Sequence, residues 1–139
     1  MRKATYWLLG VVCCLTAACA RPSAEEQATQ AALECYRRLA GGDTTVLLSA
    51  RLGADSLPAD YRRQLDSTLV RYMRDIQQKH GGLHGVSVSD NPARRDSLRG
   101  ADGHWQQVVY SFLLLHFNDS THEEIAVPMV EHHGEWRLR

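Results

Sequence analysis

Apolar residues in the first half of the chain recur at the spacing of amphipathic helices. Between positions 25 and 40 they fall three and four residues apart, and this period predicts a helix. Ser23 is a suitable N-cap for that helix, and Gly41 is suited to end it. A longer helix with the same period is predicted from about Ser56 to His80. Its apolar stripe consists of Tyr61, Leu65, Leu69, Tyr72 and Ile76.

The segment between these two helices predicts a third, short helix. Asp43 is a suitable cap, the three apolar residues that start at Val46 give it an apolar face, and it is expected to end near Leu52. Pro58 is expected in the first turn of the long helix that follows, because the missing N–H has no helical partner there.

The second half of the chain has the alternating apolar and polar pattern of β-strands. Strands are predicted over residues 83–89, 106–117, 122–131 and 135–139, and residues 94–99 predict a weak edge strand. Residues 106–117 are the richest in Val, Tyr and Phe and predict the strongest strand. Pro128 lies inside the fourth strand and predicts an edge position or a bulge.

Helices followed by consecutive antiparallel strands are typical of the α+β class. The predicted architecture is three N-terminal helices packed on a curved antiparallel sheet of about four to five strands. The chain has 139 residues, which suits one domain, and that domain is predicted to span residues 25–139.

The N-terminus carries an uncharged apolar run behind two basic residues, Arg2 and Lys3. As a helix, residues 6–18 would reach roughly 20 Å, which is short of the ~30 Å hydrocarbon core of a bilayer. This length and charge pattern predicts a signal peptide over residues 1–18.

The sequence Leu-Thr-Ala-Ala-Cys, which ends at Cys19, resembles the bacterial lipobox. The resemblance implies cleavage before Cys19, a lipid anchor on it, and a tether over residues 19–24 that holds the domain at the membrane. An ordinary signal peptide cleaved after Ala18 or Ala20 is the alternative. In other bacterial lipoproteins, an Asp directly after the lipidated Cys prevents sorting to the outer membrane. This chain has Ala20 at that position, so the resemblance to those sorting rules permits delivery to the outer membrane. The sequence does not indicate on which side of that membrane the protein would lie.

The charge balance argues against nucleic-acid binding, and the cysteine content argues against a disulfide bond. The chain has 16 basic and 16 acidic residues, so no basic excess is available for nucleic-acid binding. Cys35 is the one cysteine after position 19, so no disulfide is expected within the domain. It shares a helical face with Ala28, Ala32 and Leu39, which favours a core residue over a nucleophile.

Three segments resemble the nuclear transport factor two-like superfamily, and within it small lipoproteins of Bacteroidota. They are YRRLAGGDTTVLLS at 36–49, HGGLHGVSV at 80–88, and the closing hairpins at 108–139. The resemblance implies a cone of helices against a curved sheet and a location in the cell envelope. It implies no catalytic residues and no cofactor.

Members of that superfamily hold small apolar ligands between helices and sheet, and some carry an acid pair for proton transfer. The resemblance therefore predicts a non-catalytic module that binds a small apolar ligand or an envelope protein. The alternative is an enzyme that uses the same cavity, which would need an interior carboxylate. A cavity would be lined by the following residues, which in the other reading simply fill the core: Tyr61, Tyr72, Trp105, Tyr110, Phe112 and His116. The sequence leaves the oligomeric state open.

Four late histidines, at 116, 122, 132 and 133, raise the question of a metal site. No helical His pair at i, i+4 and no Cys pair accompanies them, so no metal site is predicted.

Five aspartates are followed by Ser or Thr and then by Thr or Leu. This triplet resembles the O-glycosylation acceptor of Bacteroidota envelope proteins. The other reading is that Asp and Ser occur here because they suit caps and turns. In the first reading the modified residues would be Thr44, Ser56, Ser67, Ser97 and Ser120.

Overall fold

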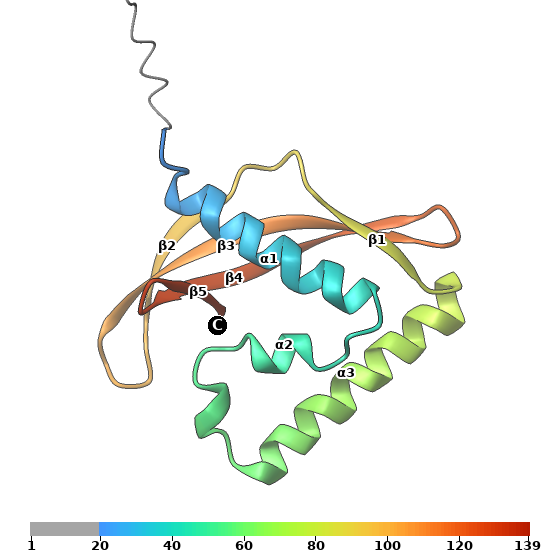
Figure 1. The fold of residues 1–139 in the computed structure, drawn as a ribbon, viewed down its shortest axis with the longest axis horizontal. Coiled ribbons are helices and arrows are strands. Elements are labelled where there is room, and N and C mark those ends of the chain that lie inside the picture. The colour runs from blue at the N-terminus through green and yellow to red at the C-terminus, as the bar shows by residue number, and fades with distance from the viewer. Residues whose placement is uncertain (1–19) are drawn as a thin grey trace, which may run out of the picture.

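The computed structural model describes residues 20–139 (Figure 1). The helices are α1 (Ala24–Ala40), α2 (Val46–Ser49), the 3-10 helix η1 (Ala54–Ser56) and α3 (Ala59–His80). The strands are β1 (Leu83–Val88), β2 (Arg94–Arg99), β3 (Trp105–Phe117), β4 (His122–His132) and β5 (Glu135–Leu138). The α+β prediction, with three helices on a curved antiparallel sheet, is confirmed. The predicted signal peptide and Cys19 lie outside the described residues.

Helix α1 begins at a complete capping box. The Ser23 hydroxyl accepts a hydrogen bond from the Glu26 backbone N–H, and the Glu26 carboxylate accepts one from the Ser23 N–H. These bonds satisfy two backbone donors that a helix start leaves free. The predicted apolar face is buried at Ala28, Ala32 and Leu39, so α1 is the helix that packs most closely on the sheet.

The short second helix is smaller than predicted. The Asp43 carboxylate accepts hydrogen bonds from the backbone N–H and hydroxyl of Thr45, at 3.1 and 2.7 Å, and pairs with Arg38. These bonds make residues 43–45 a turn, so α2 begins only at Val46. The predicted start of the long helix is corrected in the same way. Ser56 lies in η1, and Pro58 directly precedes α3.

The sheet has the strand order β1-β3-β4-β5, and β2 pairs with the same edge of β3 as β1. β1 pairs with the second half of β3 and β2 with its first half. The long strand β3 therefore spans the whole sheet.

Pro128 lies at a local edge position of β4, as expected, because the pairing of β4 with β5 begins only at Met129. It lies in β4, between β3 and β5, opposite Tyr110. Its carbonyl accepts a hydrogen bond from the Arg139 N–H at 3.0 Å, so its nitrogen points to the side where β5 has already ended at Leu138. The missing proline N–H thus removes no bond between β4 and β5.

The core lies between α1 and one face of the sheet. Alternate β3 residues from Val109 to Phe117 are buried on that face, and among them Ser111 accepts a hydrogen bond from the Thr29 hydroxyl of α1 at 3.1 Å. Helix α3 contributes less, because Ile76 near its C-terminal end is its one buried residue. Figure 1 shows α3 leaving the sheet toward its N-terminal end.

Candidate functional site: an apolar cleft between the helices and the sheet

A cleft of about 470 Å³ lies where α3 separates from the sheet. Residues of α1, α2, α3 and β4 and one residue that follows α2 form its walls. They are Tyr36, Leu47, Leu48, Arg51, Leu65, Asp66, Thr68, Leu69, Tyr72, Ile125 and Ala126. Apolar and aromatic side chains predominate, as in sites that hold small ligands.

The α3 wall of the cleft is the predicted apolar stripe of that helix. Leu65 and Leu69 are only partly buried, and Tyr72 keeps 39% of its surface exposed. In a helix packed fully on a sheet this stripe would lie in the core. The stripe instead faces a space that the protein does not fill.

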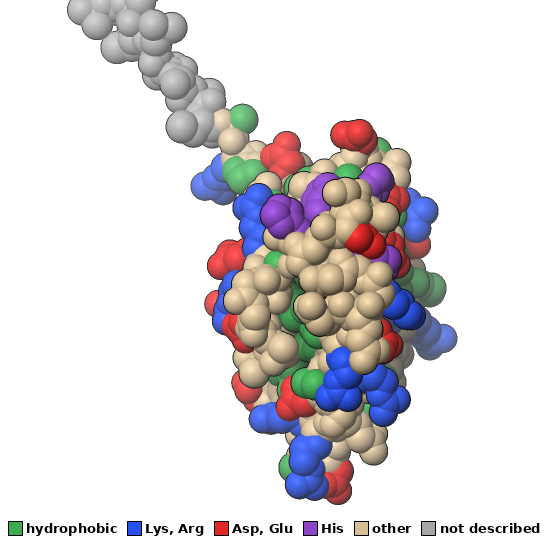
Figure 2. All heavy atoms as spheres, turned by 90° about the vertical axis from the view of Figure 1, so that its right-hand side faces the viewer, with side chains coloured by type: hydrophobic (Ala, Val, Ile, Leu, Met, Phe, Trp, Pro, Cys, Tyr) green, Lys and Arg blue, Asp and Glu red, His purple; other side chains and the backbone are tan. Residues whose placement is uncertain are grey.

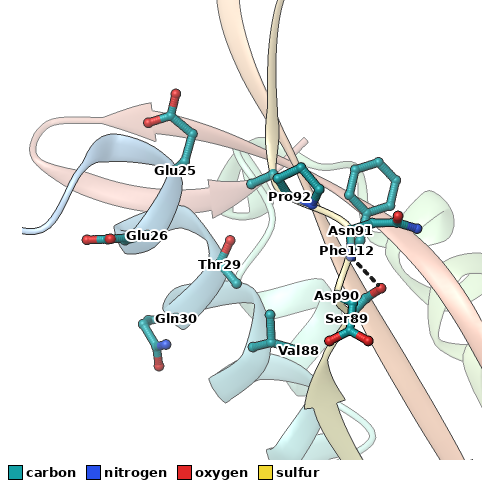
Figure 3. A pocket seen from close by; sticks show the side chains of 11 residues that line it. Glu25, Glu26, Thr29, Gln30, Val88, Ser89, Asp90, Asn91, Pro92 and Phe112 are labelled. Atoms are coloured by element: carbon teal, nitrogen blue, oxygen red, sulfur yellow. Dashed lines mark hydrogen bonds between the residues drawn. The ribbon is translucent and has the colours of Figure 1, made fainter.

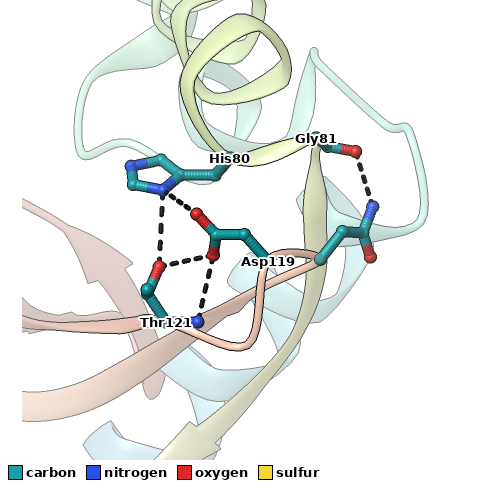
Figure 4. Close-up of polar contacts among 5 residues, drawn as sticks. His80, Gly81, Asp119 and Thr121 are labelled. Atoms are coloured by element: carbon teal, nitrogen blue, oxygen red, sulfur yellow. Dashed lines mark hydrogen bonds and ion pairs between the residues drawn. The ribbon is translucent and has the colours of Figure 1, made fainter.

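The C-terminal end of α3 is fixed to the tip of the β3–β4 hairpin (Figure 4). His80 Nδ1 lies 2.7 Å from an Asp119 carboxylate oxygen, and the His80 ring stacks on Phe117. The Asn118 side-chain amide donates to the Gly81 carbonyl at 2.7 Å. Hydrogen bonds from Thr121 and His80 lower the pKa of Asp119 to about 2. We call these contacts the latch. They hold α3 at one end, which leaves its other end free to stand away from the sheet.

Two phenols place polar groups inside the cleft. Burial, with a smaller effect of Tyr72, raises the pKa of Tyr36 to about 12. Burial also raises the pKa of Tyr72, and the Glu123 carboxylate adds to the effect. Both hydroxyls are therefore neutral at pH 7 and can donate or accept a hydrogen bond. Cys35 lies nearby on α1, where burial raises its thiol pKa, so it is not an activated nucleophile.

A second hollow of about 380 Å³ lies at the start of α1 (Figure 3). The loop 89–93, Phe112 and several polar residues of α1 line it. Glu25 is held there by Arg95, which lowers the Glu25 pKa. Its lining is less apolar than that of the cleft and includes acidic residues, so this hollow is the poorer of the two sites for an apolar molecule.

Comparisons with known proteins bear on the fold. No protein-family model matches the chain, and no curated protein matches its sequence. A solved structure does match it, a candidate NTF2-like transpeptidase of Campylobacter jejuni, with a TM-score of 0.53 and 11% sequence identity. The match covers 77% of this chain and 92% of that one. The chain has the nuclear transport factor two-like fold. A likeness at this identity shows the fold alone.

Within this nuclear transport factor two-like fold, the aromatic residues predicted from sequence do not gather in one cavity. Tyr72 lines the cleft, and Phe112 lines the second hollow. Tyr61 is 43% exposed on α3, and Trp105 is 73% exposed at the start of β3. The Arg94 guanidinium lies over the Tyr110 ring, with its carbon 5.5 Å from the ring centre. His116 Nε2 lies 2.7 Å from the Ser87 hydroxyl oxygen.

The spread of these residues has a simple cause. Successive β3 side chains point to opposite faces of the sheet, so Tyr110 and His116 lie on the face away from α1. Sequence reasoning missed Tyr36, Leu48 and Ile125, which do line the cleft. The helical periods contained a signal for the first two, because Tyr36 borders the predicted core face of α1 and Leu48 belongs to the apolar run of α2.

The histidines lie in two places. Figure 2 shows histidine side chains gathered at the end of the molecule that carries the latch, where the rings of His116 and His122 are 6.2 Å apart. The rings of His132, the last residue of β4, and His133 meet edge to face with their centres 4.0 Å apart. Within residues 20–139 no three His, Cys, Asp or Glu side chains are grouped so as to hold a metal ion. Among these same residues, no helix combines the length and the apolar character of a membrane span.

The Asp-Ser/Thr triplets have more than one local role. Asp43 and Asp119 bond the same way, each accepting from the N–H and hydroxyl of the Thr two residues on. Thr44 and Ser120 lie between the bonded partners. The other three candidate glycosylation positions take part in no such turn and are exposed, as Ser120 also is: Ser56, Ser67 and Ser97. Turn geometry thus accounts for two triplets, and it leaves the modification reading open for the exposed hydroxyls.

Proposed function

We propose that the protein binds a small apolar ligand in the cleft between its helices and β4. The observation that carries the proposal is the half-exposed apolar stripe of α3, which faces Leu48 and Ile125 across the cleft. A volume of about 470 Å³ is within the range of roughly 300–1,000 Å³ typical of ligand sites.

Burial of this apolar surface is the source of binding free energy. Each square ångström of apolar surface removed from water contributes about 25 cal/mol. The stripe on α3 is already ordered in the structure, so a ligand would gain that energy without ordering a new segment. The Tyr36 and Tyr72 hydroxyls give the ligand two points for a hydrogen bond. An open cleft of this size favours a small ligand over a protein partner.

The experiment uses a dye that fluoresces in apolar sites, N-phenyl-1-naphthylamine, with residues 20–139 as the protein. Leu69→Trp places a bulky ring in the cleft and should weaken dye binding by about tenfold or more, equivalent to about 1.4 kcal/mol. Val70→Trp is the matched control, because Val70 is 46% exposed and does not line the cleft. Equal dye affinity in both variants would contradict the proposal.

The location proposed for this binding module is the cell envelope, with a lipid anchor on Cys19. The support is the lipobox-like sequence and the charged, apolar N-terminus. Two or more acyl chains give stable membrane attachment, whereas one chain gives marginal binding. In the full chain, Cys19→Ser should abolish palmitate labelling and release the protein from the membrane fraction. Unchanged labelling and fractionation would contradict the anchor.

Proton transfer in the same cleft is the second candidate function, and one observation favours it. Asp66 lines the cleft and is partly buried among apolar side chains, where a carboxylate can act as a base. An enzyme of this kind would exchange an acidic C–H proton of its bound ligand with solvent. Deuterium uptake into a bound ketone in heavy water, lost in Asp66→Asn, would support it; the absence of uptake would contradict it.

O-glycosylation is proposed for the exposed hydroxyls of the triplets. Ser67 is the clearest test position, because it lies on the solvent side of α3 and lines no part of the cleft. Mass spectrometry of the protein from its own host should find added hexose mass on the peptide that contains it. A mass that exceeds the polypeptide only by acyl chains would contradict the modification.

A further inference from the structure

One charged side chain of the cleft lacks an ionic partner within residues 20–139. Arg51 lies two residues after the end of α2 and is partly buried, and none of the ion pairs among the described residues includes it. Its backbone position is fixed on both sides. The Leu52 N–H donates to the Leu138 carbonyl at 2.7 Å, and the Leu138 N–H donates to the Ala50 carbonyl at 2.9 Å. The guanidinium is therefore carried by a rigid part of the fold.

Charges of both signs lie around Arg51, because Asp55 and Asp66 line its two hollows and the neighbouring Arg137 is paired with Glu135. Arg51 also lines a smaller hollow of about 220 Å³ beside the cleft, together with His132 and Arg137. Asp55 is the one acidic residue that lines this hollow among residues 20–139. On the cleft side Asp66 is the corresponding acidic residue, and no ion pair joins it to Arg51.

Arg51 is partly buried, lines an apolar cleft and has no ionic partner among residues 20–139. A ligand anion in the cleft would supply that partner. Guanidinium groups bind carboxylates through two parallel N–H···O bonds, and such bonds are stronger than those between neutral groups. The apolar walls would at the same time take an aliphatic chain.

We infer that the cleft binds an aliphatic monocarboxylate, with the carboxylate on Arg51 and the chain between α3 and β4. This inference rests on the proposed function and gives the chemical class of its ligand. The charged end of the ligand would bind Arg51, and its hydrocarbon chain would contact the Leu and Ile side chains of the cleft.

The test compares three probes with the same chain and different head groups: dodecanoate, dodecanol and dodecylammonium. Each displaces N-phenyl-1-naphthylamine from residues 20–139 at pH 7, below its micelle concentration. Dodecanoate should bind about tenfold more tightly than dodecanol, as a charged hydrogen-bonded pair predicts. Dodecylammonium should bind less tightly than dodecanol.

Two variants of Arg51 separate the charge from the fold. Arg51→Met should bring dodecanoate down to the affinity of dodecanol and leave dodecanol nearly unchanged. Arg51→Lys keeps the charge without the planar fork, so it should keep part of the preference. Arg63→Gln is the matched control, because Arg63 is exposed on α3 and does not line the cleft; its preference should equal that of the unmodified protein.

The outcomes distinguish the ligand class from the site. Equal binding of dodecanoate and dodecanol, tighter binding of dodecylammonium, or an unaltered preference in Arg51→Met would overturn the carboxylate inference and leave the cleft as a ligand site. Dye binding without displacement by any dodecyl probe would also overturn it. If the unmodified protein did not bind the dye at all, the proposed function would be contradicted.

Discussion

Asp119 at the β3–β4 hairpin tip pairs with His80, the last residue of α3, across 2.7 Å between a carboxylate oxygen and Nδ1. This contact joins segments 39 residues apart in the sequence. It fixes the C-terminal end of α3, which the left-handed Gly81 terminates, against the hairpin tip.

The latch should weaken in acid. The folded-state pKa of Asp119 is about 2, below its ordinary 3.8, so its contribution to stability is fully present above pH 3.8 and is lost as the pH falls toward 2. Asp119→Asn removes this charge, and the variant should lose less stability over that pH interval than the unmodified protein. Urea unfolding at pH 5, 3.5 and 2.5 measures the difference. Parallel losses in both proteins would contradict the role of the pair.

Gly82 should not tolerate a side chain, because its φ is +116° and an added Cβ would lie 2.8 Å from the Asn118 side-chain nitrogen. Gly82→Ala is expected to destabilise the protein by about 1–2 kcal/mol or more. Gly85→Ala is the control, since nothing lies within 4 Å of an added Cβ there. Thermal unfolding should show a lower Tm for Gly82→Ala alone. Equal Tm values would show that the backbone at Gly82 does not require glycine.

Cys35 should react slowly with thiol reagents. Burial is the first cause of its raised pKa, and Glu34 is the second, so little thiolate is present at pH 8. With residues 20–139 in Ellman's reagent, the native protein should react more slowly than the urea-unfolded protein. A native rate equal to or above that of the unfolded chain would indicate an activated thiol.

Local patterns predicted most of the fold. Residues 94–99 were predicted as a weak edge strand and form β2, the helical period predicted α1, and Gly81 with Gly82 predicted the end of α3 at His80. Pro128 was expected at an edge position, and it lies just outside the β4–β5 pairing, which begins at Met129. Asp43 was read as a helix cap, but its bonds to Thr45 form a turn before the helix.

The cleft was harder to predict than the fold. The apolar stripe of α3 is visible in the sequence, and it predicts contact with the sheet rather than separation from it. The latch fixes only the His80 end of α3, through a contact with Asp119 that cannot be seen in either segment alone. Aromatic character was a poor guide to the lining, because Tyr110 and His116 occupy β3 positions that face away from α1.

The most direct test of the ligand site is a set of intermolecular nuclear Overhauser effects between bound N-phenyl-1-naphthylamine and methyl-labelled residues 20–139. The account predicts contacts from the dye to the methyl groups of Leu48, Leu69 and Ile125, on three different elements that meet at the cleft. Contacts confined to Val88 and Ala93 would place the dye in the second hollow and contradict the account.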